Sequence, residues 1–150
     1  MCLPLANAPS ATKPPEPDFL QATAKLRVLV VDDYADVAES LALLLQKKGH
    51  DVETADCGLK AIEKARSFRP QVVLLDIGLP DISGYEVVKR LRELPETRQA
   101  FLIAISGYGG PEYIEQSESS GFDEHLLKPV DPLKLSAVLA TAAARMTVAG

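Results

Sequence analysis

The feature that most constrains the fold of this chain is a fivefold alternation of short apolar runs with stretches of helical periodicity. Each apolar run has the length of a β-strand, and each is followed by a segment that fits an amphipathic helix. The five runs are RVLVV (27–31), DVETA (51–55), QVVLL (71–75), FLIAI (101–105) and EHLL (124–127). A chain of 150 residues has room for one domain with a real core. The pattern therefore predicts a single α/β domain.

Local signals mark the ends of three of the predicted helices. The first helix stops at Gly49, and the third opens with Ser83 followed by Glu86, the spacing of a capping box. The fifth begins at Asp131 and Pro132, an N-cap residue followed by proline at the first helical position. These signals place helices directly after the first, third and fifth strands.

The fourth helical segment, residues 111–121, has weaker signals. Only Tyr113 and Ile114 offer large apolar side chains there, and several serines interrupt the pattern. We therefore expect this segment to have the weakest packing and to be the first to move.

The composition of the strands predicts their order in the sheet. The first, third and fourth runs are unbroken apolar stretches, as expected of parallel strands covered by helices on both faces. Residues 51–55 alternate between polar and apolar, and residues 124–127 form a short run, so both belong at the edges. A doubly wound parallel sheet with strand order 2-1-3-4-5 satisfies both observations. In such a sheet, sites form at the carboxyl ends of the strands, beside the switch point between strands one and three.

Five polar residues follow the strands at that edge. Asp32 and Asp33 follow the first strand, Asp76 the third, Ser106 the fourth and Lys128 the fifth. Three carboxylates brought together would repel one another, but Mg²⁺ prefers oxygen ligands and would convert the repulsion into binding. The arrangement predicts a Mg²⁺ site formed by the carboxylates.

A magnesium site alone does not require the serine hydroxyl or the lysine ammonium. A phosphoryl group on Asp76 would require both, because its oxygens must be shared among the cation, Ser106 and Lys128. A carboxylate can act as the nucleophile in such a transfer. The residues therefore predict Mg²⁺-dependent formation of an acyl phosphate on Asp76.

Four segments of the chain also resemble the receiver domains of two-component response regulators. They are VVDDYAD (30–36), LLDIGLPDISGYE (74–86), AISGY (104–108) and LLKPVDP (126–132), in the order and spacing of that family. The resemblance covers residues 25–146 and leaves outside it a proline-rich start, 1–24, and a short tail, 147–150. It implies a flavodoxin-like (βα)5 fold.

The resemblance also implies a role for each residue at the carboxyl edge. Asp76 would be the phosphoacceptor, Asp33 a direct Mg²⁺ ligand and Asp32 a ligand that acts mainly through water. The same matching extends to four further features, namely the backbone carbonyl of Gly78 as a metal ligand, Ser106 as a phosphoryl-binding switch, Lys128 as the partner of the phosphoryl charge, and a cis peptide bond between Lys128 and Pro129.

The chain departs from the family pattern at His125, because many receivers have Tyr or Phe at that position, three residues before the lysine. We therefore expect an altered aromatic switch, with His125 in a modified role and Tyr108 near enough to influence access of water to the phosphoryl group. The ending GFDEHLLKPVDP is similar to receivers fused to sensor histidine kinases, so a terminal receiver of a hybrid kinase is one possible context. Leu43, an apolar residue on a polar helical face, is a candidate contact for a helical phosphodonor.

Composition and charge narrow the classes of partner. The net charge is −5, and no run of basic residues is longer than the Lys47–Lys48 pair, so we expect no direct binding of nucleic acid. Cys2 and Cys57 have no metal-ligand spacing, which suits a reducing compartment. The proline-rich residues 1–24 read as a flexible tail or linker without a signal peptide, and no apolar run reaches the length of a membrane span. These features predict a cytoplasmic protein.

The sequence therefore predicts a signalling switch whose only enzymatic activities are its own phosphorylation and slow dephosphorylation. The phosphodonor would be a histidine kinase or a histidine phosphotransfer protein, and output would pass to a downstream protein effector because only MTVAG follows Arg145. One alternative is a receiver-like module that binds partners without phosphorylation. A phosphohydrolase of the haloacid dehalogenase type needs a second Asp two positions after its nucleophile, whereas Asp32 and Asp33 are adjacent. A flavin site would lack a phosphate-binding loop.

Overall fold

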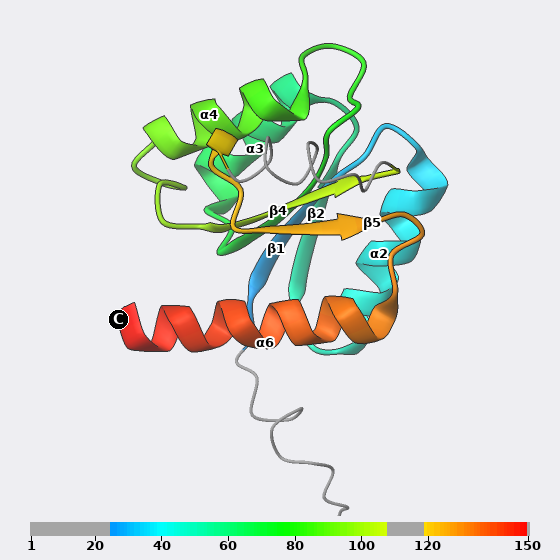
Figure 1. Ribbon diagram of the computed structural model, residues 1–150, viewed down its shortest axis with the longest axis vertical. Helices are drawn as coiled ribbons and strands as arrows, with labels where there is room; N and C mark the ends of the chain where they lie inside the picture. The colour runs from blue at the N-terminus through cyan, green and yellow to red at the C-terminus, as the bar shows by residue number, and fades with distance from the viewer. Residues whose placement is uncertain (1–24, 108–118, 150) are drawn as a thin grey trace, which may run out of the picture.

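A five-stranded parallel sheet forms the centre of the molecule in the computed structural model, which describes residues 25–107 and 119–149. The strand order is β2-β1-β3-β4-β5, as the sequence predicts (Figure 1). The strands are β1 (Arg27–Val31), β2 (Asp51–Ala55), β3 (Val72–Asp76), β4 (Phe101–Ser106) and β5 (Glu124–Leu127).

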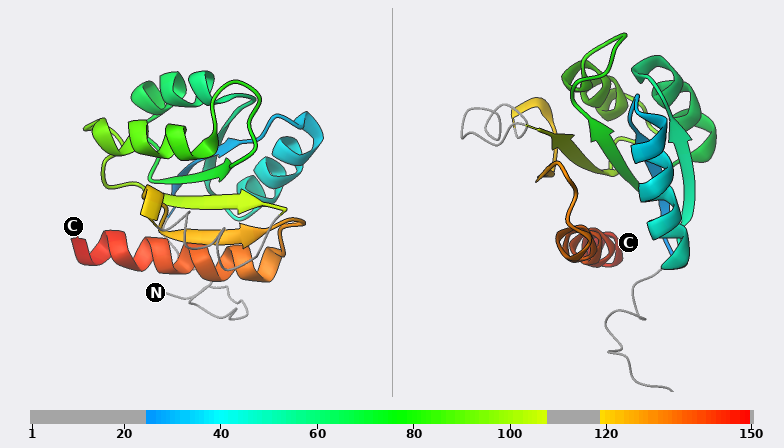
Figure 2. Two further views of the ribbon diagram at one scale, coloured as in Figure 1. Left: turned by 45° about the horizontal axis from the view of Figure 1, so that its top comes forward. Right: turned by 90° about the vertical axis from the view of Figure 1, so that its right-hand side faces the viewer.

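Helices cover both faces of the sheet, so the fold is the predicted doubly wound sandwich of flavodoxin-like type (Figure 2). The helices are α2 (Ala35–Lys47), α3 (Gly58–Phe68), α4 (Gly84–Glu93) and α6 (Pro132–Ala149). One core packs beneath α2 and α6, and the other beneath α3 and α4. The predicted fourth helix lies mostly outside the described residues, and α6 continues past residue 146 to Ala149.

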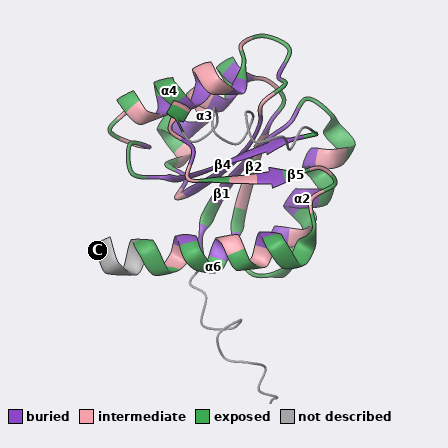
Figure 3. Ribbon diagram, viewed as in Figure 1, coloured by how far each residue is buried: buried purple, intermediate pink, exposed green. Residues whose placement is uncertain are grey.

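The side chains of β1 show how the sequence builds these two cores. Val28 and Val30 enter the core beneath α2 and α6, whereas Leu29 and Val31 enter the core beneath α3 and α4. Consecutive residues of a strand point to opposite faces, so an unbroken apolar run is buried on both sides. Every residue of β3 and β4 is buried, but β2 and β5 keep exposed positions (Figure 3). The edge positions predicted for β2 and β5 are confirmed.

The helix ends follow the sequence signals. Gly49, just after α2, has φ 96°, a left-handed conformation that glycine adopts without steric cost. Ser83 Oγ accepts a hydrogen bond from the Glu86 amide at 3.2 Å. Asp131 Oδ1 accepts one from the Leu133 amide at 2.9 Å. These caps fix where the helices begin, and so where the loops at the carboxyl edge of the sheet lie.

Candidate functional site at the carboxyl edge of the sheet

The structure brings the three predicted carboxylates together at the ends of β1 and β3. Oxygens of Asp32, Asp33 and Asp76 lie within 4.8 Å of one another. The Asp32 and Asp76 side chains are buried, and Asp33 is exposed. Parallel pairing of β1 with β3 produces this convergence, because Val31 lies beside Leu75 and the residue after each of them is an aspartate.

The Lys128 ammonium group forms ion pairs with two of these carboxylates. Its Nζ lies 2.9 Å from Asp76 Oδ2 and 3.3 Å from Asp32 Oδ2. Burial alone would lower the pKa of Lys128, but the hydrogen bond and the charge of Asp76, together with Asp32, raise it above its usual value. The lysine is therefore cationic at neutral pH. The Lys128–Pro129 peptide bond is cis, the conformation that the family resemblance implies.

The Asp32 carboxyl is in an unusual electrostatic position. Burial raises its pKa, while a hydrogen bond from the Tyr34 amide at 2.9 Å and the charge of Lys128 act in the opposite direction. Its Oδ2 is buried and accepts no hydrogen bond from the described residues, although it lies at ion-pair distance from Lys128. A buried carboxylate oxygen of this kind is stabilised when a cation binds it.

The donor set therefore fits Mg²⁺. All of the groups gathered here offer oxygen, which is the ligand type that hard divalent cations prefer. Asp32 Oδ2 also accepts no hydrogen bond from the described residues, and a bound cation would satisfy this oxygen.

The loop after β3 positions the Asp76 side chain through a hydrogen bond and through close backbone packing. Asp76 Oδ1 accepts a hydrogen bond from the Gly78 amide at 2.9 Å. The Gly84 amide donates to the Ile77 carbonyl at 2.8 Å, and a Cβ at Gly84 would lie 2.6 Å from Ile77 Cα and 2.9 Å from the Asp76 carbonyl oxygen. The start of α4 thus packs directly on the backbone that follows Asp76, in a space that only glycine fits.

Ser106 and His125 form a pair beside the carboxylates. Ser106 Oγ lies 3.0 Å from His125 Nε2, and Ser106 follows Ile105, the residue that pairs with Asp76. Burial lowers the pKa of His125, so its imidazole is neutral at pH 7. A neutral ring can accept a hydrogen bond from the Ser106 hydroxyl or donate one to the Ser106 oxygen, depending on its tautomer. The side chain at the unusual position therefore contacts the predicted switch residue directly.

Two other residues near this edge have roles that sequence reasoning missed. The Tyr34 ring centroid lies 5.7 Å from Lys128 Nζ, a cation–π distance. Asp81 accepts hydrogen bonds from the Gly58 and Leu59 amides at 2.8 and 2.9 Å, and these bonds, Leu59 first, hold its pKa below its usual range. Cysteine at the N-cap of α3 was the sequence signal for the Asp81 contacts. The Cys57 side chain makes no capping hydrogen bond, so the first amides of the helix need an acceptor from elsewhere.

Leu43, Tyr108 and the expected absence of a membrane span are the remaining sequence predictions. Leu43 is 58% exposed, as its place on the polar side of α2 predicts. Tyr108 lies outside the described residues. Within residues 25–107 and 119–149, no helix has the length and apolar character needed to span a membrane.

Comparison with known proteins identifies the class to which this fold and site belong. Residues 28–140 match the family described as the response regulator receiver domain. This match spans well over half of the chain, which therefore belongs to the receiver-domain family of response regulators.

Individual relatives agree with the family assignment. An uncharacterized 14.6 kDa protein from the sodA1 3′ region of Leptolyngbya boryana is 34% identical over 116 residues, covering 77% of this chain and 88% of that protein. The cell cycle response regulator CtrA of Brucella ovis is 36% identical over 104 residues, covering 69% of this chain and 44% of CtrA. The chain thus spans less than half the length of the CtrA proteins that it matches.

Solved structures show the same fold. A CheY-like receiver domain protein from Methanospirillum hungatei superposes with a TM-score of 0.78 at 27% identity, covering 85% of this chain and 100% of that one. The chemotaxis protein CheY4 of Vibrio cholerae gives a TM-score of 0.75 at 29% identity, covering 79% of this chain and 99% of that one.

Proposed function

We propose that this receiver is a signalling switch that accepts a phosphoryl group on Asp76 in a Mg²⁺-dependent reaction. The observation that carries the proposal is the contact of Asp76 with Lys128 at 2.9 Å, inside a group of three carboxylates whose oxygens lie within 4.8 Å. A lysine cation beside a nucleophilic carboxylate suits transfer of a group that brings negative charge with it.

In the proposed reaction, an Asp76 carboxylate oxygen attacks the phosphorus of a phosphohistidine on the donor protein. A phosphorus–oxygen bond forms, the phosphorus–nitrogen bond breaks, and the electron pair of that bond leaves with the donor imidazole. Attack of water on the phosphorus of the acyl phosphate later releases inorganic phosphate and restores the carboxylate. This chemistry makes the protein a phosphoacceptor with self-phosphorylation and self-dephosphorylation only.

The residues around Asp76 have separate roles in this proposal. Asp32, Asp33, Asp76 and the Gly78 carbonyl would hold Mg²⁺, which when bound neutralises part of the phosphoryl charge. Lys128 would form an ion pair with a phosphoryl oxygen, and the Ser106 hydroxyl would donate a hydrogen bond to another. Because Lys128 already lies close to Asp76 and Asp32, it needs little rearrangement to do so.

We further propose that Ser106 and His125 transmit the phosphorylation state. If Ser106 Oγ moves toward a phosphoryl group, it must lengthen or break its 3.0 Å contact with His125 Nε2. The ring would then reorient on β5. The hydrogen bond thus gives the switch two discrete arrangements, as a two-state element requires.

The partners follow from the chemistry. A histidine kinase or a histidine phosphotransfer protein would supply the phosphoryl group, with the exposed Leu43 on α2 as a contact, and a downstream protein effector would read the result. We propose residues 25–146 as the receiver domain, residues 1–24 as a linker and 147–150 as a tail, in a cytoplasmic setting. A terminal receiver of a hybrid histidine kinase is one arrangement that fits this organisation.

The test is the intact mass of the full chain after incubation with Mg²⁺ and acetyl phosphate. We expect a gain of one phosphoryl group, which disappears in Asp76→Asn and when a chelator removes Mg²⁺. No gain in the wild type, with Mg²⁺ binding demonstrated by calorimetry, would contradict the proposal and favour a receiver that binds its partners without phosphorylation.

A further inference from the structure

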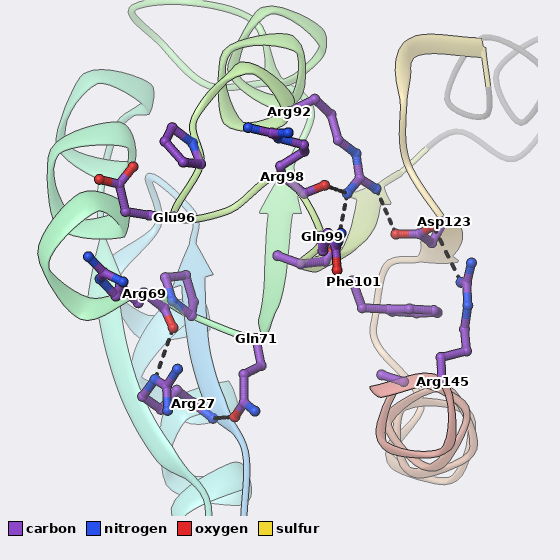
Figure 4. Close-up of a pocket in the computed structure, with 14 residues that line it drawn as sticks. Arg27, Arg69, Gln71, Arg92, Glu96, Arg98, Gln99, Phe101, Asp123 and Arg145 are labelled. Carbon is purple, nitrogen blue, oxygen red and sulfur yellow. Dashed lines mark hydrogen bonds and ion pairs between the residues drawn. The ribbon is translucent and has the colours of Figure 1, made fainter. Parts of the chain in front are cut away.

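A polar cavity lies at the opposite end of the strands from Asp76. It has a volume of about 890 Å³ and lies where β1 and β4 begin and where Gln71 leads into β3 (Figure 4). This volume is within the range of small-molecule binding sites, which is roughly 300–1,000 Å³. The proposed phosphorylation chemistry uses none of the residues that line it.

Arginines dominate the lining of this cavity. Five of the seven arginines of the chain contribute to it, although the net charge of the protein is −5. Figure 4 shows their guanidinium groups on several sides of the cavity, with Arg27 and Arg69 on one side and Arg145 on the other. The five are Arg27, Arg69, Arg92, Arg98 and Arg145.

Two of the five guanidinium groups share the carboxylate of Asp123. Asp123 lies 2.7 Å from Arg92 and 3.3 Å from Arg145. Arg92 also donates to the carbonyl oxygens of Gly121 and Ala100, and the Arg145 guanidinium lies 4.9 Å from the Phe101 ring centroid. These two arginines therefore form a structural network that builds one wall of the cavity.

The other three guanidinium groups have no anionic partner in the part of the chain that the structure describes. No carboxylate in residues 25–107 and 119–149 lies within ion-pair distance of Arg27, Arg69 or Arg98. Arg27 uses its Nε to donate to the Arg69 carbonyl at 2.9 Å, which leaves its terminal nitrogens available and holds the two residues side by side. Three available guanidinium groups around one cavity suit a ligand with several negative charges.

The backbone of Arg69 gives an independent indication that its side chain has a role. Arg69 ends α3 with φ 54° and ψ 61°, and it is the only non-glycine residue with positive φ in the described part of the chain. Glycine is the residue that fits this position best, since an arginine there experiences steric strain. An outlier retained at the mouth of a cavity is a reason to consider function.

The same cavity also offers a hydrogen-bond acceptor and apolar walls. Glu96 lines it, and Glu96 Oε1 is buried without a hydrogen-bond partner among the described residues. Pro70 and Pro95 supply apolar surface next to these charges. A simple inorganic anion would use the guanidinium groups but would leave the Glu96 oxygen unsatisfied.

We propose that this cavity binds a purine nucleoside polyphosphate. The phosphate groups would contact Arg27, Arg69 and Arg98, and the amino group of the base would donate to the Glu96 carboxylate once that side chain turns toward the cavity, with the prolines against the ring or the ribose. The ligand would bind independently of phosphorylation of Asp76, at the other end of the strands.

Calorimetric titration of the full chain with GTP, in buffer containing a chelator, tests the proposal. Removing divalent cations prevents the carboxylates around Asp76 from recruiting the nucleotide through a metal ion. We expect saturable binding at one site, at least tenfold tighter than that of pyrophosphate. Glu96→Ala should abolish this preference for GTP over pyrophosphate.

Two variants test the arginines without endangering the fold. Arg69→Gly should maintain or increase thermal stability, because glycine suits the left-handed conformation, yet weaken GTP binding at least tenfold. Arg98→Gln, an exposed change, should have a similar effect, whereas Arg90→Gln outside the cavity should have none. Absence of GTP binding, or binding unaffected by Arg69→Gly and Arg98→Gln, would overturn the proposal. Arginine-dependent binding of an oligoglutamate peptide in place of GTP would also overturn it, in favour of an acidic protein segment.

Discussion

Ser106 Oγ and His125 Nε2 lie 3.0 Å apart, so the hydroxyl at the end of β4 contacts an imidazole on the neighbouring edge strand. The register places Ala104 beside His125 and Ser106 beside Leu127, and the bond therefore runs diagonally across the strand pair. This relationship links the proposed phosphorylation site to β5, because any movement of Ser106 changes the environment of His125.

Substitution of His125 should uncouple the two strands. In the wild type, we expect phosphorylation to shift the amide resonances of Glu124–Leu127. His125→Leu removes the hydrogen bond but keeps apolar bulk, so these shifts should fall at least twofold while the extent of phosphorylation stays the same. Glu124→Gln, an exposed change on the same strand, is the control. Wild-type shifts confined to the residues around Asp76, or equal shifts in His125→Leu, would contradict the coupling.

Replacement of Lys128 should separate metal binding from phosphoryl transfer. Lys128→Gln removes a positive charge close to Asp76 and Asp32, so Mg²⁺ affinity should be maintained or increase. The phosphorylation rate should fall by about tenfold or more, because the incoming phosphoryl charge loses its ion pair. Calorimetry and time-resolved mass measurements check the two effects, with Lys134→Gln on α6 as the control. A parallel loss of Mg²⁺ affinity would show instead that the lysine organises the metal site.

Gly84→Ala should disturb the packing of α4 on the backbone of Asp76 and Ile77. The new methyl group would meet backbone atoms of Asp76 and Ile77, which cannot move aside as a flexible side chain can. We expect a loss of about 1–3 kcal/mol in the free energy of unfolding, measured with urea, together with weaker Mg²⁺ binding. Gly107→Ala is a matched control, since a Cβ there would meet no atom within 4 Å. Equal stability of the two variants would show that the loop after β3 relaxes freely.

Stability should fall on acidification through His50. This buried side chain accepts a hydrogen bond from the Leu26 amide on Nδ1 at 3.0 Å, and burial, aided by the charge of Lys48, lowers its pKa below 6.5. The unfolded chain therefore binds a proton more readily, and the free energy of unfolding should decrease as the pH falls below about 6.5. The decrease levels off below the pKa of the folded state, and its slope for this group is at most about 1.4 kcal/mol per pH unit.

A single substitution isolates the contribution of His50. In His50→Asn the amide oxygen can accept the Leu26 hydrogen bond at the position of Nδ1, without a titratable group. Urea unfolding at pH 7 and pH 5 should then show a smaller difference than in the wild type, with His125 and the carboxylates accounting for the remainder. An unchanged difference would mean that His50 does not titrate in this range.

Substitution of Leu43 should slow phosphoryl transfer from the donor protein without changing the stability of the fold. Leu43→Asp changes an exposed side chain on α2, so the melting temperature should remain within about 2 °C of the wild type. Transfer from a histidine phosphotransfer protein or kinase should slow severalfold if α2 docks against the donor, while phosphorylation by acetyl phosphate is unaffected. Ser40→Asp adds the same charge at an exposed polar position of the helix. Equal transfer rates for wild type and Leu43→Asp would exclude this docking surface.

The order of the strands was predictable because burial is encoded in each strand separately. An unbroken apolar run such as residues 72–75 is stable only where helices cover both faces, and the alternation in residues 51–55 suits an edge. The approach of Asp32, Asp33 and Asp76 followed from that order, since parallel neighbours end at the same edge of the sheet. Most of the carboxylate cluster could thus be predicted from the sequence.

Other contacts depend on register and on loop paths that a linear pattern does not carry. The bond between Ser106 and His125 requires the observed β4–β5 register, and the Asp81 contacts with the amides of α3 require two loops to meet. The arginine-lined cavity could not be predicted from a run of basic residues, because its five arginines are spread along the sequence from Arg27 to Arg145.

The sequence by itself determined the fold class, the edge of the sheet that carries the carboxylates and the identity of the groups there, because hydrophobic periodicity and helix caps act over a few residues at a time. Only the tertiary structure decided which side chains touch, Lys128 with both Asp76 and Asp32 and Ser106 with His125. It also gathered around one cavity three arginines that have no carboxylate partner among the described residues. Hydrogen bonds and ion pairs act over a few ångströms, so they exist only after long-range packing has set the positions of the backbone.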